Sequence, residues 1–307
     1  MISTAAEPST VYLIAGTPRT GTTVLCQALA AAGAAEPTEW FSRAQLSNAR
    51  LSYLTTPGGT DRAQSVAACR GYLLDRLRQT CRKGVSGFKL HWHQLAQLMR
   101  AGTGEPVNEL LTGQLLPARI RVVMVTRSPV DVQAVSVLRA YASGVFATDG
   151  AGSQTILRYD DAFWGPPGVA AAARTRLGTG DVYDYADLKE ICETIAQANE
   201  QWRGYLRALG TPTRHISYDD LAGDLVACAN TILADLALPD LTAAYQPALV
   251  VQRDAVTAAM LQRYRADAAH AARAIVPRQG PEAVDTAGPC AAPSSRSSRS
   301  TRHSPGH

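Results

Sequence analysis

The chain has 307 residues, of which 46% are hydrophobic and 18% charged, and its formal net charge is +4. This length allows one large domain or two small ones with a sizeable core. The mild positive charge does not by itself indicate a nucleic-acid or membrane partner, and no apolar run reaches the ~18 residues that a membrane span requires.

The N-terminus and the cysteines indicate the compartment. The first ten residues have neither the basic start nor the apolar stretch of a secretory signal. The six cysteines form no Cys-x-x-Cys pair and no cluster with histidines at zinc spacing. We therefore expect free thiols, no metal site, no integral membrane association and a cytoplasmic location.

The first half of the chain alternates apolar runs with helical patterns. Residues 11–15, V-Y-L-I-A, predict a buried strand that ends at a glycine, and 22–33 predict a helix closed by a glycine. A helical pattern covers about 64–82, and the apolar run 85–90 predicts a second strand. The β-branched run 121–126 predicts a third strand. Strand, glycine loop and helix together are typical of the start of an α/β unit.

The second half continues this alternation. Pro129 suits the first turn of a helix that runs to about Tyr141. A long helical pattern covers 187–209, a fourth strand is predicted over 214–218, and a helix over 224–236. The order of elements predicts an α/β fold with a P-loop-like parallel β-sheet, flanked by helices on both faces.

Two segments depart from the pattern. Residues 144–181 are irregular and rich in glycine and proline, with G-P-P-G at 165–168, and we interpret them as either a mobile insertion or a lid that binds the acceptor. After a last helix near 255–275, the Pro/Ser/Arg-rich tail 277–307 lacks the apolar surface needed to fold. We therefore predict one domain over 1–276 and a disordered tail.

The loop G-T-P-R-T-G-T-T (16–23) has the glycine spacing of a phosphate-binding loop. A loop between a strand and a helix start directs backbone N–H groups and the positive end of the helix dipole at one point, which favours an anion. The lysine that reaches the outer phosphates of a nucleoside triphosphate is replaced by Thr22, and the only basic side chain is Arg19. The loop therefore suits an anion that reacts without a magnesium ion.

A second anion-binding element follows the third strand. In R-S-P-V-D-V-Q-A-V-S (127–136), Arg127 ends the strand and Ser136 lies on the next helix. A guanidinium can bind a phosphate through two hydrogen bonds. Two such anion sites on one sheet predict a ligand that is phosphorylated at two places.

The loop P-R-T-G-T-T, the Arg127–Ser136 element and three further segments resemble the sulfotransferases that use 3′-phosphoadenosine-5′-phosphosulfate (PAPS). The further segments are E-P-T-E-W-F (36–41), G-F-K-L-H-W-H-Q (87–94) and R-Y-R (263–265). The pattern is most similar to the bacterial Stf0-type, trehalose 2-sulfotransferase-like family, and it covers about residues 11–268. This resemblance implies the sulfotransferase fold, PAPS as co-substrate, a hydroxyl-bearing acceptor and a homodimer.

The resemblance also implies which residues contact PAPS. The 5′-phosphosulfate would lie on the loop residues Thr17, Pro18, Arg19, Thr20, Gly21, Thr22 and Thr23. The 3′-phosphate would be held by Arg127 and Ser136, with Arg253 as a further contact. Arg19 and Lys89 would stabilise the charge that develops during sulfuryl transfer.

The general base has two candidates. Glu39 matches the glutamate of the Stf0 type, whereas Lys89-Leu90-His91 has the spacing of the lysine and catalytic histidine in animal cytosolic sulfotransferases. We favour Glu39 and leave His91 open. The predicted acceptor contacts are Glu36, Trp40 and His93.

Two other functions are compatible with the glycine loop. A P-loop kinase or NTPase would need magnesium, and neither its lysine nor a clear strand-plus-aspartate motif is present. A non-catalytic protein would bind the nucleotide without turnover. The leading hypothesis is a sulfotransferase acting on a carbohydrate, glycolipid or natural-product hydroxyl without a metal.

Overall fold

The computed structural model describes residues 7–57, 61–148, 154–156, 168–178, 180–248 and 254–275. The chain divides into two units, Met1–Ala268 and Ala269–His307. The described part of the second unit is the end of helix α11 (Ala255–Ile275). The single domain over 1–276 stays a prediction, and the tail 277–307 lies outside the described residues.

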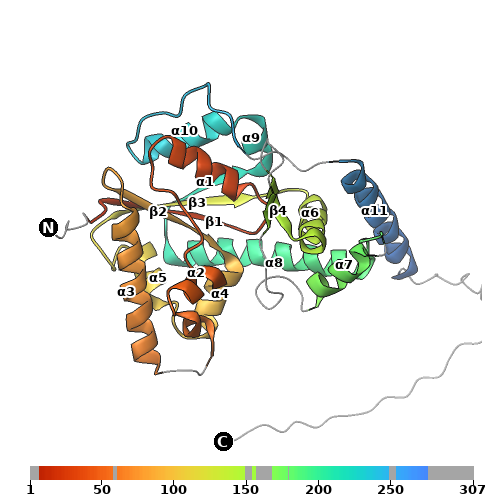
Figure 1. Cartoon of the computed structure of the whole chain (residues 1–307), viewed down its shortest axis with the longest axis horizontal. Coiled ribbons are helices and arrows are strands. Elements are labelled where there is room, and N and C mark those ends of the chain that lie inside the picture. The colour runs from red at the N-terminus through yellow and green to blue at the C-terminus, as the bar shows by residue number, and fades with distance from the viewer. Residues whose placement is uncertain are drawn as a thin grey trace, which may run out of the picture. The chain divides into compact units, whose positions relative to one another are not determined.

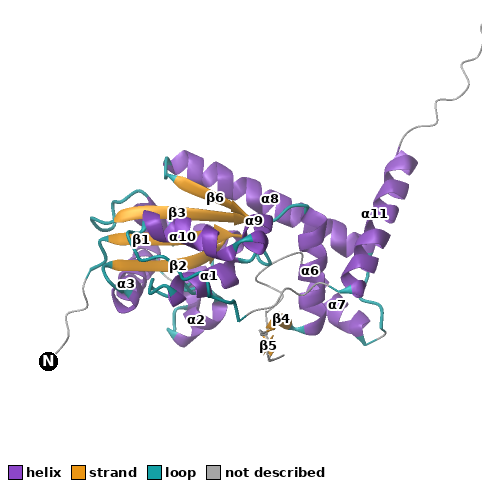
Figure 2. Cartoon of the chain, turned by 90° about the horizontal axis from the view of Figure 1, so that it is seen from above, coloured by secondary structure: helices purple, strands orange, loops and turns teal. Residues whose placement is uncertain are grey.

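The first unit contains a four-stranded sheet in the order β2-β1-β3-β6 (Figure 2). The strands are β1 (Thr10–Gly16), β2 (Val85–His91), β3 (Arg119–Thr126) and β6 (Thr213–Ser217), and all neighbours are parallel. The four predicted strands and the predicted parallel sheet are confirmed. Because the strands are parallel, their carboxyl ends and the loops that follow them lie along one edge.

Side chains of β1, β2 and β3 enter two separate cores on the two faces of the sheet, as the two-residue period of a strand requires. Leu13 contributes to a core with α3 (Arg62–Thr80), α4 (Trp92–Arg100), α5 (Glu105–Leu111) and α8 (Tyr185–Leu209). Ile14 contributes to a core with α1 (Thr22–Ala31), α9 (Tyr218–Gly223) and α10 (Leu225–Asp235). Figure 1 shows α1 and α10 on one side of the sheet and α3 and α8 on the other. Helices cover both faces, as predicted.

A third core joins α8 to α6 (Val130–Ser143), α7 (Val169–Leu177) and the first part of α11. The helix predicted to carry Pro129 in its first turn is α6; it begins one residue later, at Val130, and Pro129 is its N-cap.

The segment 144–181, predicted to be irregular, contains the antiparallel strands β4 (Val145–Thr148) and β5 (Gln154–Ile156) and helix α7. The alanine-rich run after Gly168 has high helix propensity, which explains α7. Residues 149–153, 157–167 and 179 of this segment lie outside the described residues.

Two short helices, α2 (Arg43–Asn48) and the 3-10 helix η1 (Ser52–Thr55), complete the described elements. Within the described residues, no helix combines the length and apolar character needed to cross a membrane. The described cysteines are free thiols, as predicted.

Candidate active site

The glycine loop connects β1 to α1 at the carboxyl edge of the sheet. A Cβ atom at Gly16 would lie 2.8 Å from the carbonyl oxygen of Val125, so only glycine fits where the chain leaves the sheet. Arg19 (φ 68°) and Gly21 (φ 84°) both have left-handed backbone conformations. Gly21 offers no side-chain cap to the start of α1, so the first N–H groups of this helix remain available to an anion.

Buried polar side chains from two distant helices hold the loop in place. Gln133 of α6 donates from Nε2 to Thr17 Oγ1 (2.8 Å) and to the carbonyl oxygen of Pro18 (2.6 Å). Thr17 in turn donates to Asn199 Oδ1 of α8 (3.5 Å), and Thr20 Oγ1 donates to the carbonyl oxygen of Thr17 (2.9 Å). These bonds give the Thr17 and Thr20 hydroxyls a structural role within the loop.

Gln133 and Asn199 were not predicted as site residues from the sequence. Each is a buried amide on an otherwise apolar helix stripe. A polar residue in such a position is the signal that would have identified them, because a buried amide requires hydrogen-bond partners.

The two predicted anion-binding elements are adjacent in the structure. Arg19 Nε donates to Ser136 Oγ (3.0 Å), and Arg127 Nη1 donates to the carbonyl oxygen of Arg19 (3.1 Å). The Arg127 guanidinium lies over the Tyr218 ring, 4.0 Å from its centroid. Tyr218 was not predicted as a site residue, although its ring also borders the loop at Gly21. Arg19, Arg127 and Ser136 thus form one positively charged cluster against the loop.

Glu39, Lys89 and His91 form a second, largely buried cluster. Lys89 Nζ lies 2.8 Å from Glu39 Oε1 and donates to Thr23 Oγ1 (3.1 Å) in the first turn of α1. His91 Nε2 lies 3.4 Å from the same oxygen of Glu39. Both candidate bases therefore contact each other, and Lys89 connects them to the helix that follows the glycine loop.

The Glu39–Lys89 pair is ionised. Burial by itself raises the pKa of Glu39, but the Lys89 ammonium, followed by His91, holds it well below its usual range. Burial lowers the pKa of Lys89, but the Glu39 carboxylate more than compensates and the net shift is upward. Each charge is thus the reason why the other is tolerated in a buried site.

The ring of His91 is oriented by the loop. Its Nδ1 lies 3.3 Å from the carbonyl oxygen of Gly16, which also accepts a hydrogen bond from Trp202 Nε1 (3.0 Å). Because a carbonyl oxygen only accepts, Nδ1 is the donor to Gly16. Nε2 is the atom directed at Glu39, and it bonds the carboxylate when it too carries a proton. The ring of His93 stacks on His91 with centroids 5.8 Å apart, and burial, together with His91, lowers the pKa of His93 to about 3.

The remaining predicted residues have different environments. Glu36 is exposed, whereas Trp40 is fully buried and stacks on Phe88 with ring centroids 4.8 Å apart. Trp40 therefore has a packing position and presents no surface to an acceptor in this structure. Arg253 lies outside the described residues.

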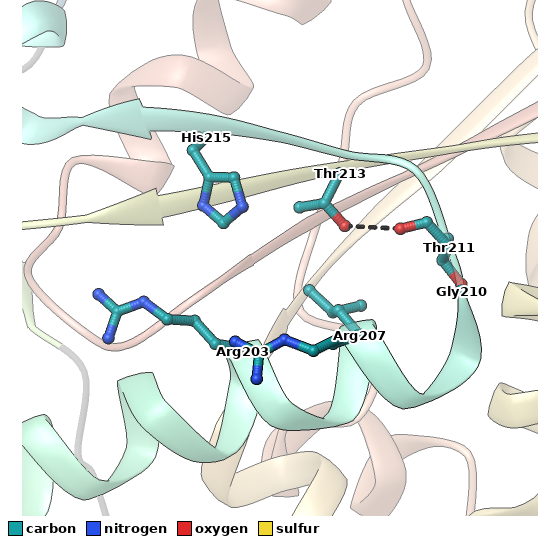
Figure 3. Close-up of a pocket in the computed structure, with 7 residues that line it drawn as sticks. Arg203, Arg207, Gly210, Thr211, Thr213 and His215 are labelled. Atoms are coloured by element: carbon teal, nitrogen blue, oxygen red, sulfur yellow. Dashed lines mark hydrogen bonds between the residues drawn. The ribbon is translucent and has the colours of Figure 1, made fainter.

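A separate cavity of about 380 Å³ lies between α8 and β6 (Figure 3). It is lined by Arg203, Leu206, Arg207, Gly210, Thr211, Thr213 and His215. No residue of the glycine loop or of the Glu39 cluster lines it, so its arginines are a useful comparison for those of the loop. The described residues contain no group of three or more His, Cys, Asp or Glu side chains that could hold a metal ion.

Comparison with known families decides the class of enzyme. The model of the Stf0 sulphotransferase family matches residues 11–267. The chain belongs to the Stf0 sulphotransferase family. It is therefore a PAPS-dependent sulfotransferase, as its resemblance to this family predicted, and the kinase and scaffold alternatives are set aside.

Among solved structures, the chain is similar to a sulfotransferase from Alicyclobacillus acidocaldarius. The identity is 13% and the TM-score 0.41, over 88% of this chain and 96% of that chain. A likeness this distant transfers no residue role to the Stf0 sulfotransferase described above. The comparison with curated proteins found no match.

Proposed function

We propose that this Stf0 sulfotransferase transfers the sulfuryl group of PAPS to a hydroxyl of a carbohydrate, glycolipid or natural-product acceptor, by metal-independent in-line displacement. The observation that carries the proposal is the contact between Lys89 and Thr23. This contact links a cluster that can take up a proton, Glu39 with His91, to the first turn of the helix after the glycine loop.

The residues at the loop fit PAPS. Backbone N–H groups and guanidinium groups are the donors that phosphate and sulfate prefer. In our proposal the loop with Arg19 holds the 5′-phosphosulfate, and Arg127 with Ser136 holds the 3′-phosphate. PAPS supplies a sulfuryl group attached to an oxygen that becomes more negative as it leaves. Arg19 and Lys89 are the cations placed to stabilise that charge.

Glu39 is the proposed general base. Its carboxylate is ionised in the free protein, and an ionised carboxylate is ready to accept the proton of the acceptor hydroxyl. Lys89 would move from Glu39 to the sulfuryl oxygens, which removes the charge that holds the pKa of Glu39 down. His91 would then orient Glu39 through an Nε2–H donor, while its Nδ1–H continues to donate to the Gly16 carbonyl oxygen.

The proposal is tested with radiolabelled PAPS and a panel of sugars, glycolipids and phenols, in buffer with EDTA and without added metal. We expect label transfer to at least one hydroxyl acceptor. Arg19→Ala should weaken the binding of 3′,5′-diphosphoadenosine by about 1.5–3 kcal/mol, roughly 10–150-fold in Kd, and lower turnover with it. Arg207→Ala removes an exposed arginine of the separate cavity and should change neither quantity. Normal donor binding by Arg19→Ala would contradict the proposed role of the loop.

We also propose that the enzyme is a cytoplasmic homodimer. The support is the family resemblance, together with the free thiols for the compartment. Light scattering of the purified full chain tests the dimer, and a monomer at micromolar concentration would contradict it.

A further inference from the structure

The segment that carries Glu39 has no helix or strand of its own. Its backbone is held on both sides of Glu39. The Thr38 carbonyl oxygen accepts a hydrogen bond from the Lys89 N–H (2.9 Å), and the Trp40 carbonyl oxygen accepts one from the Tyr72 hydroxyl (2.8 Å). These bonds fix the main chain, but the Glu39 carboxylate lies at the end of a flexible side chain. Its position therefore depends on contacts of its own.

The two carboxylate oxygens of Glu39 have different partners. Oε1 faces Lys89 and His91, whereas Oε2 accepts a hydrogen bond from Gln94 Nε2 (2.9 Å). Gln94 belongs to the first turn of α4 and is 1% exposed. Its Oε1 accepts the backbone N–H of His91 (2.9 Å). Since a backbone N–H only donates, this bond fixes the amide orientation and directs the NH₂ group at the carboxylate.

In the proposed mechanism, Lys89 moves from Glu39 to the sulfuryl oxygens during transfer. Once the Lys89 ammonium contacts the sulfuryl oxygens, the hydrogen bond from Gln94 still holds Glu39 Oε2 in place. Its amide is neutral at every pH, so it positions the carboxylate without adding a charge that would compete for the proton. We propose that Gln94 is a positioning residue that holds the Glu39 carboxylate in the geometry required for proton transfer. This inference rests on the proposed role of Glu39 as the base.

The decisive variant is Gln94→Glu. A glutamate oxygen can still accept the His91 N–H, so the start of α4 keeps its cap, but a second carboxylate now faces Glu39. Titratable groups that act on Glu39 or are acted on by it include Lys89 and His91 of β2, His93 of α4 and Cys26 of α1. These groups are the same in both proteins, so a change in the titration of Glu39 reports on the Gln94 contact.

Carbon-13 NMR of the Glu39 carboxyl in the donor-free protein is the first measurement. We expect its titration to move to higher pH in Gln94→Glu, because neighbouring carboxylates disfavour each other's ionised form. In turnover, kcat should fall by about 10–100-fold in Gln94→Glu and Gln94→Leu, with a smaller change in the KM for PAPS, since misplacing a catalytic group by about 1 Å can cost 10²-fold.

The control is Asp61→Ala, which removes the carboxylate oxygen Oδ1 that accepts hydrogen bonds from the N–H groups of Ala63 and Gln64 at the start of α3. It should lower Tm without changing the titration of Glu39 or kcat. If Gln94 only stabilised α4, its variants would behave like Asp61→Ala, and that result would overturn the inference.

Failure of the inference and failure of the proposed base are distinguishable. If Glu39→Gln keeps its rate, then Glu39 is not the base, and the role of Gln94 is rejected with it. If Glu39→Gln loses its rate while both Gln94 variants keep theirs, only the positioning role is rejected.

Discussion

The charge state of Glu39 is set by two opposing effects at a single residue. Burial raises the pKa of Glu39, whereas Lys89 and His91 lower it. The lowering is the larger effect, so the net shift of the pKa is downward. Since the folded-state pKa lies below the unfolded value of about 4.3, Glu39 contributes stability above that pH. The contribution is lost as the pH falls through the folded-state pKa.

Lys89→Met should reverse this dependence. Without the ammonium, burial becomes the main effect and the pKa of Glu39 rises above its unfolded value. Such a group contributes stability only in its protonated form, so the contribution is lost as the pH rises. We expect the variant to lose stability relative to the parent between pH 5 and 7, measured as the free energy of unfolding in urea.

Lys189→Met is the matched control, because Lys189 has an exposed side chain and an i,i+4 pair with Glu193. Exposed pairs of this kind contribute about 0.3–0.5 kcal/mol, so the control should follow the pH dependence of the parent. Parallel pH curves for Lys89→Met and the parent would show that Lys89 does not control the ionisation of Glu39.

Glu39 and His91 contact each other, so single substitutions must separate their roles. Glu39→Gln keeps the size of the side chain and removes the base, and we expect kcat to fall by about 10²–10⁴-fold. His91→Asn should cost less, because His91 orients Glu39 and takes no proton from the acceptor in our proposal. The measurement is kcat with labelled PAPS at saturating donor and acceptor. A larger loss in His91→Asn than in Glu39→Gln would assign the base to His91.

At the scale of elements, the neighbouring strands β1 and β2 approach each other closely at Gly87. A Cβ atom at this position of β2 would overlap the Tyr12 ring of β1. We expect Gly87→Ala to destabilise the protein by about 1–3 kcal/mol through overpacking, measured by urea unfolding. The control is Gly204→Ala in the interior of α8, where nothing lies within 4 Å of the added methyl group. That change should stabilise by about 0.5–1 kcal/mol, because alanine is the better helix former. A neutral Gly87→Ala would show that the Tyr12 ring moves away without cost.

Local patterns predicted most of these elements. The β-branched and apolar runs at 85–90 and 121–126 became β2 and β3, because a buried strand needs only a short apolar sequence between turns. Helix α7 was not predicted, because the glycines and prolines around it masked a short alanine-rich helix.

The site was predictable only where its residues belong to a local motif. The glycine loop and the 87–94 segment carry their signal in their own spacing. Gln133 and Asn199 form hydrogen bonds with a loop residue that lies more than 100 positions away in the sequence. The type of a single residue does not reveal such a contact. The burial of Trp40 follows from the way its segment crosses the edge of β2, where Thr38 bonds to Lys89. This arrangement depends on tertiary contacts, which the pattern of residues along the sequence does not show.

At the scale of the whole chain, the contacts of α11 show how far toward the C-terminus the folded unit extends. Met260 is buried in the core formed with α6, α7 and α8. Arg263 pairs with Asp181 (2.8 Å), and Arg265 pairs with Asp131 (2.7 Å). These arginines are exposed, so most of the stabilisation comes from the apolar contact. The described contacts thus tie α11 to the unit Met1–Ala268 up to about residue 267.

Two truncations test the predicted domain boundary. A chain that ends after Ile275 removes the Pro/Ser/Arg-rich tail, and we expect its Tm and its turnover of labelled PAPS to equal those of the full chain. A chain that ends after Asp254 removes α11 with Met260, whose burial is worth about 1.5–3 kcal/mol. Its Tm should fall by about 3–12 °C, at about 2–4 °C per kcal/mol for a domain of this size. An equal fall in Tm for the chain that ends after Ile275 would contradict the predicted boundary. It would show that the tail belongs to the folded domain, because a segment that buries no apolar surface does not raise Tm.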